Sequence, residues 1–432
     1  MSRRSVHALL RFVQGEWPPG SQPPILERLR SELQHCRYHP GSIPGYVSAA
    51  RQFLDYLRRQ ASSIEEARPA HLKAFLQMKQ ERYQKRHGCL PKHPKQWRSS
   101  YLGPIHRLLR MAQPQWPPPE PPANECERFQ REVCDGYGRW LTEVQGLSQE
   151  TLKKNGDAAR LFLRWLGERA DRESLGSLSV ADIDAYLEWR MPGLRRATRY
   201  GVSDCLRSLL RYLKFAGFLS GDLSFAVSGP VRYQFEEIPR AFTEQQVEKL
   251  LEVTRRDRRP AGLRDYAILM LLATYGLRAG EVVRLRLEDI DWRRERLRLR
   301  QSKTGVESWL PLMAPVGEAL LEYLQQGRPK TEWREVFLRV HAPIRPFSRG
   351  GSVDTSVINC RLKQAGIETN GRHGSHAFRF ARAASLMDAA VPLKSIGDLL
   401  GHQSASSTAI YLRLPTEALR AISLEVPAFE KR

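Results

Sequence analysis

The chain has 432 residues, of which 41% are apolar, so it is long enough for two or three domains that each bury a core. It carries 69 Lys and Arg against 47 Asp and Glu, which gives a formal net charge of +22. Such an excess opposes compact folding unless a polyanion is the working partner, and nucleic acid is the usual one. A ribosome, an anionic membrane surface or no polyanion at all are the alternatives that charge alone leaves open.

The sequence argues against a membrane-spanning or secreted protein. No apolar run approaches the roughly 18 residues needed to cross a bilayer. The short apolar stretch near the N-terminus is interrupted by Arg11 and Glu16, and no small-residue cleavage site follows it. The six cysteines form no CxxC pair, so neither a metal site nor a disulfide framework is predicted. We therefore expect a cytoplasmic protein without metal or cofactor.

Two stretches rich in turn residues divide the chain. Residues 113–124, QPQWPPPEPPAN, hold six prolines in twelve positions and can form neither a helix nor a central strand. A second linker at residues 221–241 contains Gly221, Gly229, Pro230 and Pro239. These linkers predict an N-terminal helical module (residues 1–112), a second helical module (125–220) and a C-terminal domain (242–432).

The segments on the two sides of the first linker resemble each other. AARQFLDYLRR from Ala49 matches AARLFLRWLGE from Ala158, and RPAHLKAFLQMK from Arg68 parallels SVADIDAYLEWR from Ser179; IHRLLRMA from Ile105 then parallels LRSLLRYLKFAG from Leu206. The offsets are 109, 111 and 101 residues, so the order is kept while the loops differ in length. Amphipathic basic helices can look alike by chance, but the kept order favours duplication of a small helical module.

The second module also presents basic residues at helical spacing that could lie against DNA phosphates. A charged helix face is more often merely solvated, so each contact is an expectation only. The candidates are Arg195, Arg196, Arg199, Arg207, Arg211 and Lys214.

The pattern changes in the C-terminal domain. Thr243, with Gln246 three residues later, has the spacing of a helix-capping box. A strongly apolar helix, DYAILMLLATYG, then ends at Gly276, and three candidate strands follow: RLEDIDW, ERLRLRQ and ESWLPL, with turn residues 302–305 between the last two. The remainder is helical from about Pro315. The predicted fold class is therefore mainly α with a small antiparallel β-sheet.

Several residues of this domain are candidates for chemistry, although each signal is weak alone. Arg278 follows the glycine stop, and Glu281 lies one helical turn further on. Lys303 falls in the turn between two predicted strands, where a lysine is usually only a solvated charge. His376 and Arg379 have the i, i+3 spacing that lets both reach one phosphate, a pattern that is more often ordinary surface charge.

A glycine-histidine pair and a tyrosine complete the set. His402 follows Gly401, and Tyr411 lies nine residues later between two apolar residues. Such a histidine is usually a helix cap, and such a tyrosine is usually half-buried. The order of all these residues along the chain is a more specific signal of function than any one of them alone.

Arg, Lys, His-x-x-Arg, Gly-His and Tyr in this order resemble the tyrosine recombinase (phage integrase) family. The resemblance covers residues 242–424, including DYAILMLLATYGLRAGEVVRLRLEDIDW and HAFRFARAASLMDAAVPLKSIGDLLGHQSASSTAIYLR, and no catalytic position departs from the family pattern. It implies that the second module is a helical core-binding domain, which in this family closes on DNA from the face opposite the catalytic domain. The N-terminal module has no place in the minimal family plan; we hypothesise a second DNA-binding or subunit-contacting unit.

The residue types match the chemistry of phosphodiester transfer. Tyr411 supplies a phenol that becomes a nucleophile on losing its proton. Arg278 and Arg379 can clamp the non-bridging oxygens through paired charge-assisted bonds, which a lysine could not match. His376 is the candidate for accepting the phenol proton, because histidine is the side-chain type that titrates near neutrality.

The remaining roles are implied by the resemblance alone. Lys303 would protonate the departing 5′-oxygen, His402 would donate a hydrogen bond to the phosphate, and Glu281 would orient its neighbours. Family members act without metal or ATP as tetramers that bridge two duplexes through a Holliday junction, and the expected partner is therefore double-stranded DNA, with accessory or partner recombinase proteins possible.

Three other functions compete with a mobile-element integrase or transposase. A housekeeping Xer-like resolvase fits less well because the N-terminal module and the proline-rich linker exceed its compact plan. A type IB topoisomerase shares the chemistry, but the helical modules ahead of the catalytic domain argue against it. A non-catalytic DNA-binding protein would explain the charge and not the ordered residue set.

Overall fold

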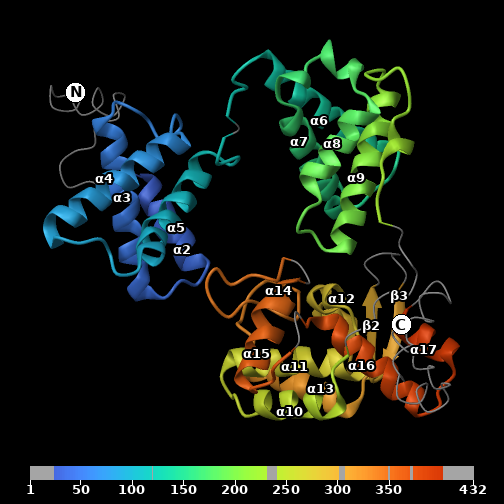
Figure 1. Cartoon of the computed structure of the whole chain (residues 1–432). Coiled ribbons are helices and arrows are strands. Elements are labelled where there is room, and N and C mark those ends of the chain that lie inside the picture. Colours follow the sequence, from blue (N-terminus) through green and yellow to red (C-terminus); the bar gives the residue numbers. More distant parts are fainter. Residues whose placement is uncertain are drawn as a thin grey trace, which may run out of the picture. The chain divides into compact units, whose positions relative to one another are not determined.

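The computed structural model describes residues 24–118, 120–230, 241–300, 307–348, 351–369 and 373–401 (Figure 1). Its contacts divide it into two compact units, residues 119–236 and residues 1–118 together with 237–432. Among the described helices, none is both long and apolar enough to cross a membrane.

The described part of the N-terminal module, from Pro24 on, contains four α-helices: α2 (Pro24–His35), α3 (Ile43–Arg59), α4 (Pro69–His87) and α5 (Pro94–Ala112). Proline at the first position starts both α4 and α5, where its missing N–H costs no hydrogen bond. Gly88 ends α4 in the left-handed region at φ 69°. Phe53 and Phe75 lie fully buried at the centre of the module.

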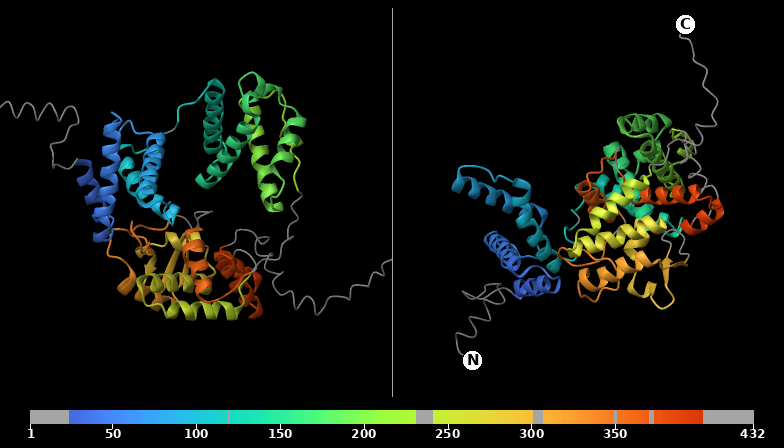
Figure 2. Two further views of the ribbon diagram at one scale, coloured as in Figure 1. Left: turned by 60° about the vertical axis from the view of Figure 1, so that its left-hand side comes forward. Right: turned by 90° about the horizontal axis from the view of Figure 1, so that it is seen from below.

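The second module also has four helices: α6 (Glu125–Glu143), α7 (Gln149–Leu166), α8 (Val180–Arg190) and α9 (Arg196–Phe215). The Asn124 side chain caps α6 by accepting the Glu127 N–H at 2.8 Å. Phe162 and Leu210 belong to the buried core. Figure 2 shows both helical modules from two further directions.

The C-terminal domain is mainly helical and carries one three-stranded antiparallel sheet in the order β1-β2-β3, as the sequence predicted. Its elements are α10 (Glu244–Arg255), α11 (Pro260–Tyr275), α12 (Ala279–Arg284), β1 (Ile290–Asp291), β2 (Arg296–Arg300), β3 (Glu307–Pro311), α13 (Ala314–Glu322), α14 (Gly351–Val353), α15 (Asn359–Gln364), α16 (Ser375–Asp388) and α17 (Leu393–Leu400).

Helix α11 runs through the core of this domain and packs against α10, α13 and α16. The predicted start of α10 is confirmed, because Thr243 Oγ1 accepts the Gln246 N–H at 3.2 Å and Gln246 Oε1 accepts the Thr243 N–H at 3.1 Å. The predicted end of α11 is confirmed as well, at Gly276 with φ 64°. Both boundaries therefore follow from local sequence signals.

The sheet differs from the prediction in its first strand. RLEDIDW was expected to be extended throughout, but only Ile290–Asp291 pairs with β2. Leu287–Asp289 forms a 3-10 turn instead, because the Asp289 carboxylate accepts the Arg286 N–H at 2.9 Å and tightens the chain. Strands β2 and β3 pair from Arg296 opposite Pro311 to Arg300 opposite Glu307, as expected for a ribbon.

An ion-pair network joins Arg264 and Asp265 of α11 to Arg361 of α15 and to Asp257 in the turn before α11. Arg264, Asp265 and Arg361 are each at most 6% exposed. The Asp265 carboxylate accepts from Arg264 Nη2 at 2.6 Å and from Arg361 Nε at 2.8 Å, and Arg361 Nη1 also donates to Asp257 at 2.8 Å. Hydrogen bonds from Arg259 and then Arg361 hold the pKa of the Asp257 carboxyl well below its usual range. Asp265 therefore compensates two guanidinium groups at once.

Replacing Asp265 with Asn is expected to destabilise the C-terminal domain by about 3–5 kcal/mol, because two buried cations lose their shared counter-charge. Urea unfolding of the full chain, followed by circular dichroism, measures the change. Asp388→Asn is the matched control, since Asp388 is exposed on α16 and should change stability by less than about 0.5 kcal/mol. Equal midpoints for the two variants would contradict the assigned role of the network.

Candidate active site

Arg278 and Glu281 lie together at the start of α12. The Arg278 N–H donates to Glu281 Oε2 at 2.9 Å, and Arg278 Nη1 donates to Glu281 Oε1 at 2.8 Å. The Glu281 side chain is 4% exposed and the Arg278 side chain 25% exposed. A buried carboxylate thus holds the Arg278 guanidinium in place while the arginine side chain stays partly exposed, an arrangement that suits the binding of an anion.

Arg379 connects three segments that are far apart in the sequence. It is 4% exposed on α16. Its Nη1 donates to the Gly276 carbonyl at 3.0 Å, and its Nη2 donates to the Leu400 carbonyl. Gly276 lies two residues before Arg278, and Leu400 lies two residues before His402. One guanidinium therefore ties the helix ends that lead to two other predicted site residues.

The backbone position of Gly276 disfavours any larger residue. Its φ of 64° is one that side chains with a Cβ rarely adopt. A Cβ built there would lie 2.8 Å from Leu400 Cδ2 and 3.5 Å from Arg379 Cα. The close packing of α11, α16 and α17 at this point is therefore favoured by the absence of a side chain.

His376 lies one helical turn before Arg379, in the first turn of α16, and is exposed. Asp354 holds the start of this helix, since its Oδ1 accepts the Ser375 N–H at 2.7 Å. A Cβ at Gly374 would come within 3.0 Å of the Asp354 carboxylate. Sequence reasoning missed Asp354, because nothing local relates it to a helix that begins 21 residues later.

Three predicted site residues, Lys303, His402 and Tyr411, lie outside the described residues. The strands before and after the segment that holds Lys303 are described, and so is the helix that ends two residues before His402. The structure pairs Arg278 with Glu281 and joins Arg379, on the same helix as His376, to the carbonyl of Gly276 two residues before Arg278. Within the described ranges, no group of His, Cys, Asp and Glu side chains could hold a metal ion.

The six predicted basic residues lie on α9 or directly before it, and all except Arg207 are exposed. Two of them hold the loop after the helix: Arg207 Nη2 donates to the Val227 carbonyl at 2.9 Å, and Lys214 Nζ donates to the Ser220 carbonyl. Arg199 Nε donates to the Leu194 carbonyl at 2.9 Å, before the helix. DNA contact by any of the six stays a prediction.

Comparison with known proteins identifies the class. The phage integrase family model matches residues 240–417. The integrase/recombinase-like protein y4gC of Sinorhizobium fredii is 52% identical over 193 residues, 45% of this chain and 98% of the relative. Tyrosine recombinase XerD of Proteus mirabilis is 32% identical over 290 residues, 66% of this chain and 88% of the relative. The chain belongs to the phage integrase family and is a tyrosine site-specific recombinase.

Solved structures agree on the fold. The XerH site-specific recombinase in a post-cleavage complex with a palindromic difH substrate has a TM-score of 0.53 at 16% identity, covering 69% of this chain and 86% of XerH. A lambda integrase tetramer bound to a Holliday junction has a TM-score of 0.51 at 19% identity, covering 72% of this chain and 86% of the integrase. At such identities the likeness concerns the fold alone.

Proposed function

We propose that this recombinase cleaves and rejoins DNA through a 3′-phosphotyrosine at Tyr411, with Arg278 and Arg379 binding the scissile phosphate. The observation that carries the assignment is the double contact of Arg379 with the Gly276 and Leu400 carbonyls, because it gathers the helix ends that precede Arg278 and His402. The family order of site residues supports the same assignment.

The covalent step balances without a cofactor. The Tyr411 phenol oxygen attacks phosphorus as the bond to the 5′-oxygen breaks, the phenol proton passes to His376, and Lys303 protonates the departing 5′-hydroxyl. Negative charge on the non-bridging oxygens is balanced by the two arginines and by a hydrogen bond from His402. Glu281 is a positioning residue, since it holds Arg278 through both carboxylate oxygens. Religation reverses these transfers, so the phosphodiester energy is kept in the tyrosyl bond.

The biological role we propose is integration and excision, or transposition, of a mobile element. The integrase/recombinase-like protein y4rA of Sinorhizobium fredii is 38% identical over 292 residues and supports this role, as does the helical module ahead of the minimal two-domain plan. A housekeeping Xer-like resolvase is the second candidate, favoured by the similarity to XerD. In either role we expect a homotetramer that bridges two DNA sites, as the lambda integrase tetramer does on its Holliday junction.

The test uses nicked suicide duplexes tiled across the DNA that flanks the gene in its native replicon. We expect an SDS-resistant protein–DNA adduct on one duplex, because the short strand beyond the nick diffuses away and religation fails. Peptide mapping of the adduct should place the nucleotide on the peptide that contains Tyr411. The absence of any adduct, despite tight and salt-sensitive binding, would indicate a DNA-binding protein without cleavage activity.

A further inference from the structure

The two helical modules share an aromatic core whose geometry is the same in both. In the N-terminal module the three rings are Phe53, Tyr56 and Phe75, and at offsets of 109 and 111 residues the second module has Phe162, Trp165 and Tyr186. The first two rings stack at 6.3 Å in each module, with interplanar angles of 21° and 20°. The first and third rings meet edge to face at 5.3 and 4.9 Å, and the second and third at 5.5 and 5.3 Å.

A capping contact recurs at the same offset. The Arg68 N–H donates to His71 Nδ1 at 3.2 Å at the start of α4, and the Ser179 N–H donates to Asp182 Oδ2 at 2.9 Å at the start of α8. The capping residues are of different types, but in both helices a backbone N–H donates to the side chain three residues later. Chance similarity of amphipathic helices does not reproduce ring angles and caps together, so we infer that the two modules are copies of one unit.

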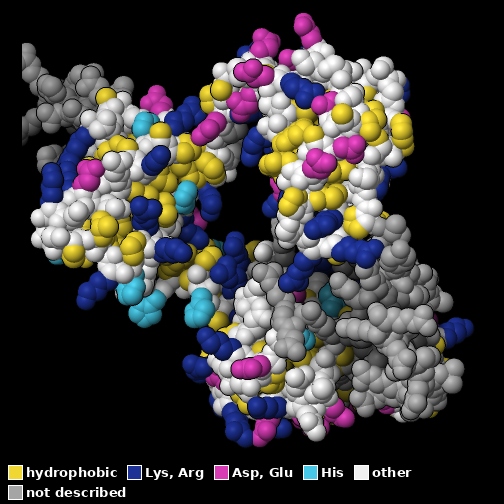
Figure 3. All heavy atoms as spheres, viewed as in Figure 1, with side chains coloured by type: hydrophobic (Ala, Val, Ile, Leu, Met, Phe, Trp, Pro, Cys, Tyr) yellow, Lys and Arg dark blue, Asp and Glu magenta, His cyan; other side chains and the backbone are white. Residues whose placement is uncertain are grey.

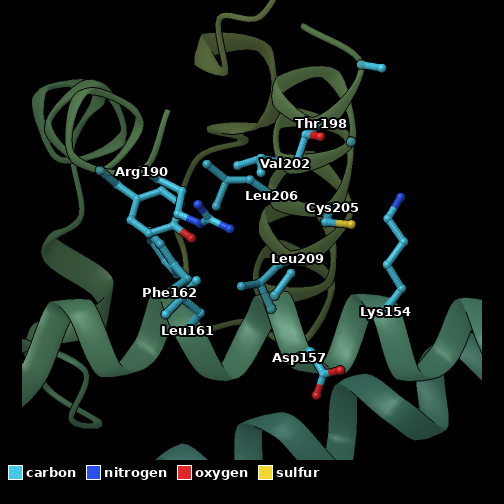
Figure 4. A pocket seen from close by; sticks show the side chains of 14 residues that line it. Lys154, Asp157, Leu161, Phe162, Arg190, Thr198, Val202, Cys205, Leu206 and Leu209 are labelled. Carbon is cyan, nitrogen blue, oxygen red and sulfur yellow. The ribbon is translucent and has the colours of Figure 1, made fainter. Parts of the chain in front are cut away.

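The two modules differ in their packing, because the second module contains a cavity. A cavity of about 350 Å³ lies between α7, α8 and α9 (Figure 4). Thr198 and Val202 of α9 line it, and the offset of 101 residues puts Trp97 and Tyr101 of α5 at these positions. The N-terminal module therefore places large aromatic rings where the second module has small side chains.

These rings support a longer helix hairpin. Tyr83 of α4 lies 6.0 Å from Trp97, which lies 5.2 Å from Tyr101, which in turn meets the core ring of Phe75 at 6.1 Å. Helix α4 has 19 residues, whereas its counterpart α8 has 11. The aromatic ladder thus joins the far end of the hairpin to the module core through edge-to-face ring contacts.

The end of this hairpin, residues 82–98, is strongly basic; we refer to it as the α4–α5 tip. It has no Asp or Glu, and the stretch from Pro69 to Ala112 contains ten Lys and Arg against Glu81 alone. The six tip cations are exposed and form no ion pair with any carboxylate of the described residues: Arg82, Lys85, Arg86, Lys92, Lys95 and Arg98. Figure 3 shows Lys and Arg side chains over the visible face of this module.

Duplication has kept basic residues at matching positions. Lys95, Arg98 and Arg110 of α5 correspond, at the offset of 101 residues, to three of the basic residues of α9, namely Arg196, Arg199 and Arg211. All six side chains are exposed. Packing does not require a cation at an exposed helix position, so the agreement points to a shared ligand of negative charge.

We propose that the N-terminal module is a second DNA-binding unit whose α4–α5 tip contacts the phosphates of duplex DNA. It extends the protein–DNA interface beyond the region held by the second module and the catalytic domain. Exposed, unpaired cations on a rigid scaffold supply salt-dependent affinity without base readout. This binding is independent of strand cleavage.

The test compares full-length variants that lose equal charge. Lys85, Arg86 and Lys95 are replaced by Gln in the tip variant, while Arg28, Arg58 and Arg59, exposed on α2 and α3, are replaced by Gln in the control. Gln keeps helix propensity close to that of Lys and Arg, so both variants should fold. Binding to a mixed-sequence duplex is measured across a range of salt concentrations, with hydroxyl-radical footprinting on the protein's own cleavage site.

We expect the tip variant to lose affinity about tenfold or more and to reduce the slope of log affinity against log salt by about 0.9 for each lost contact. Its footprint should shorten while the control behaves as wild type, and Lys85→Arg/Arg86→Lys/Lys95→Arg should restore binding. Equal losses in tip variant and control, or no loss in either, would overturn the proposal. So would unchanged DNA binding with altered self-association, which would make the tip a protein contact. Adduct formation by the wild type is a separate readout, so failure here leaves the cleavage assignment standing.

Discussion

Tyr411→Phe is expected to bind DNA as the wild type does and to form no covalent adduct. Phenylalanine keeps the ring and lacks the oxygen that attacks phosphorus, so strand cleavage should fall by at least about 10³-fold, to the limit of detection. Affinity should change by less than about twofold, because binding rests on many phosphate contacts. Suicide duplexes with SDS gels measure the adduct, and a gel-shift titration measures the binding.

Tyr266→Phe is the matched control. Tyr266 lies in the same domain on α11 and is half-buried, and its loss of a hydroxyl should leave adduct formation unchanged. If the Tyr411→Phe protein still formed the adduct, the nucleophile would be another side chain, and peptide mapping would locate it.

The parts of the fold that were predicted correctly depend on local signals. The Thr243–Gln246 box starts α10 and Gly276 ends α11, because capping and left-handed backbone involve residues a few positions apart. The pair of Arg278 and Glu281 is equally local. The first strand was predicted too long because the Asp289 cap competes with extended structure, and alternating apolar residues do not reveal that competition.

What sequence reasoning missed depends on contacts between distant segments. The bond from Arg379 to the Gly276 carbonyl spans 103 residues, and that from Arg361 to Asp265 spans 96. Asp354 caps α16 from another helix in the same way. In each case the spacing along the chain carries no trace of the contact, because tertiary packing alone brings the partners together.

The similarity between the two helical modules can be read from the sequence in one respect and not in another. Matching order along the chain predicts a duplication of the helical module, since apolar positions recur wherever a helix face is buried. The cavity of the second module was not predictable, because it depends on the space that the small side chains of Thr198 and Val202 leave between helices. The residues of one helix do not reveal how much space the neighbouring helices leave beside it.

Arg379→Lys is expected to lower cleavage by roughly 10²–10³-fold while the domain stays folded. Lysine keeps the charge but lacks the planar fork, so it cannot bridge the Gly276 and Leu400 carbonyls and also bind phosphate. The lost hydrogen bonds should cost about 1–3 kcal/mol of stability. Single-turnover cleavage and thermal melting measure the two effects, and Arg284→Lys, on the exposed side of α12, should change neither.

A second variant separates contact with the phosphate from support of the helix ends. In Arg379→Ala, added guanidinium ion should restore part of the cleavage rate if the side chain touches the phosphate, since a free cation can enter the vacated space. If melting temperature and cleavage instead fall together, and guanidinium restores neither, Arg379 is a positioning residue that acts through Gly276 and Leu400. The distinction matters for the mechanism, because only the first outcome leaves two arginines at the scissile phosphate; the second leaves Arg278 as the single guanidinium there, held by Glu281.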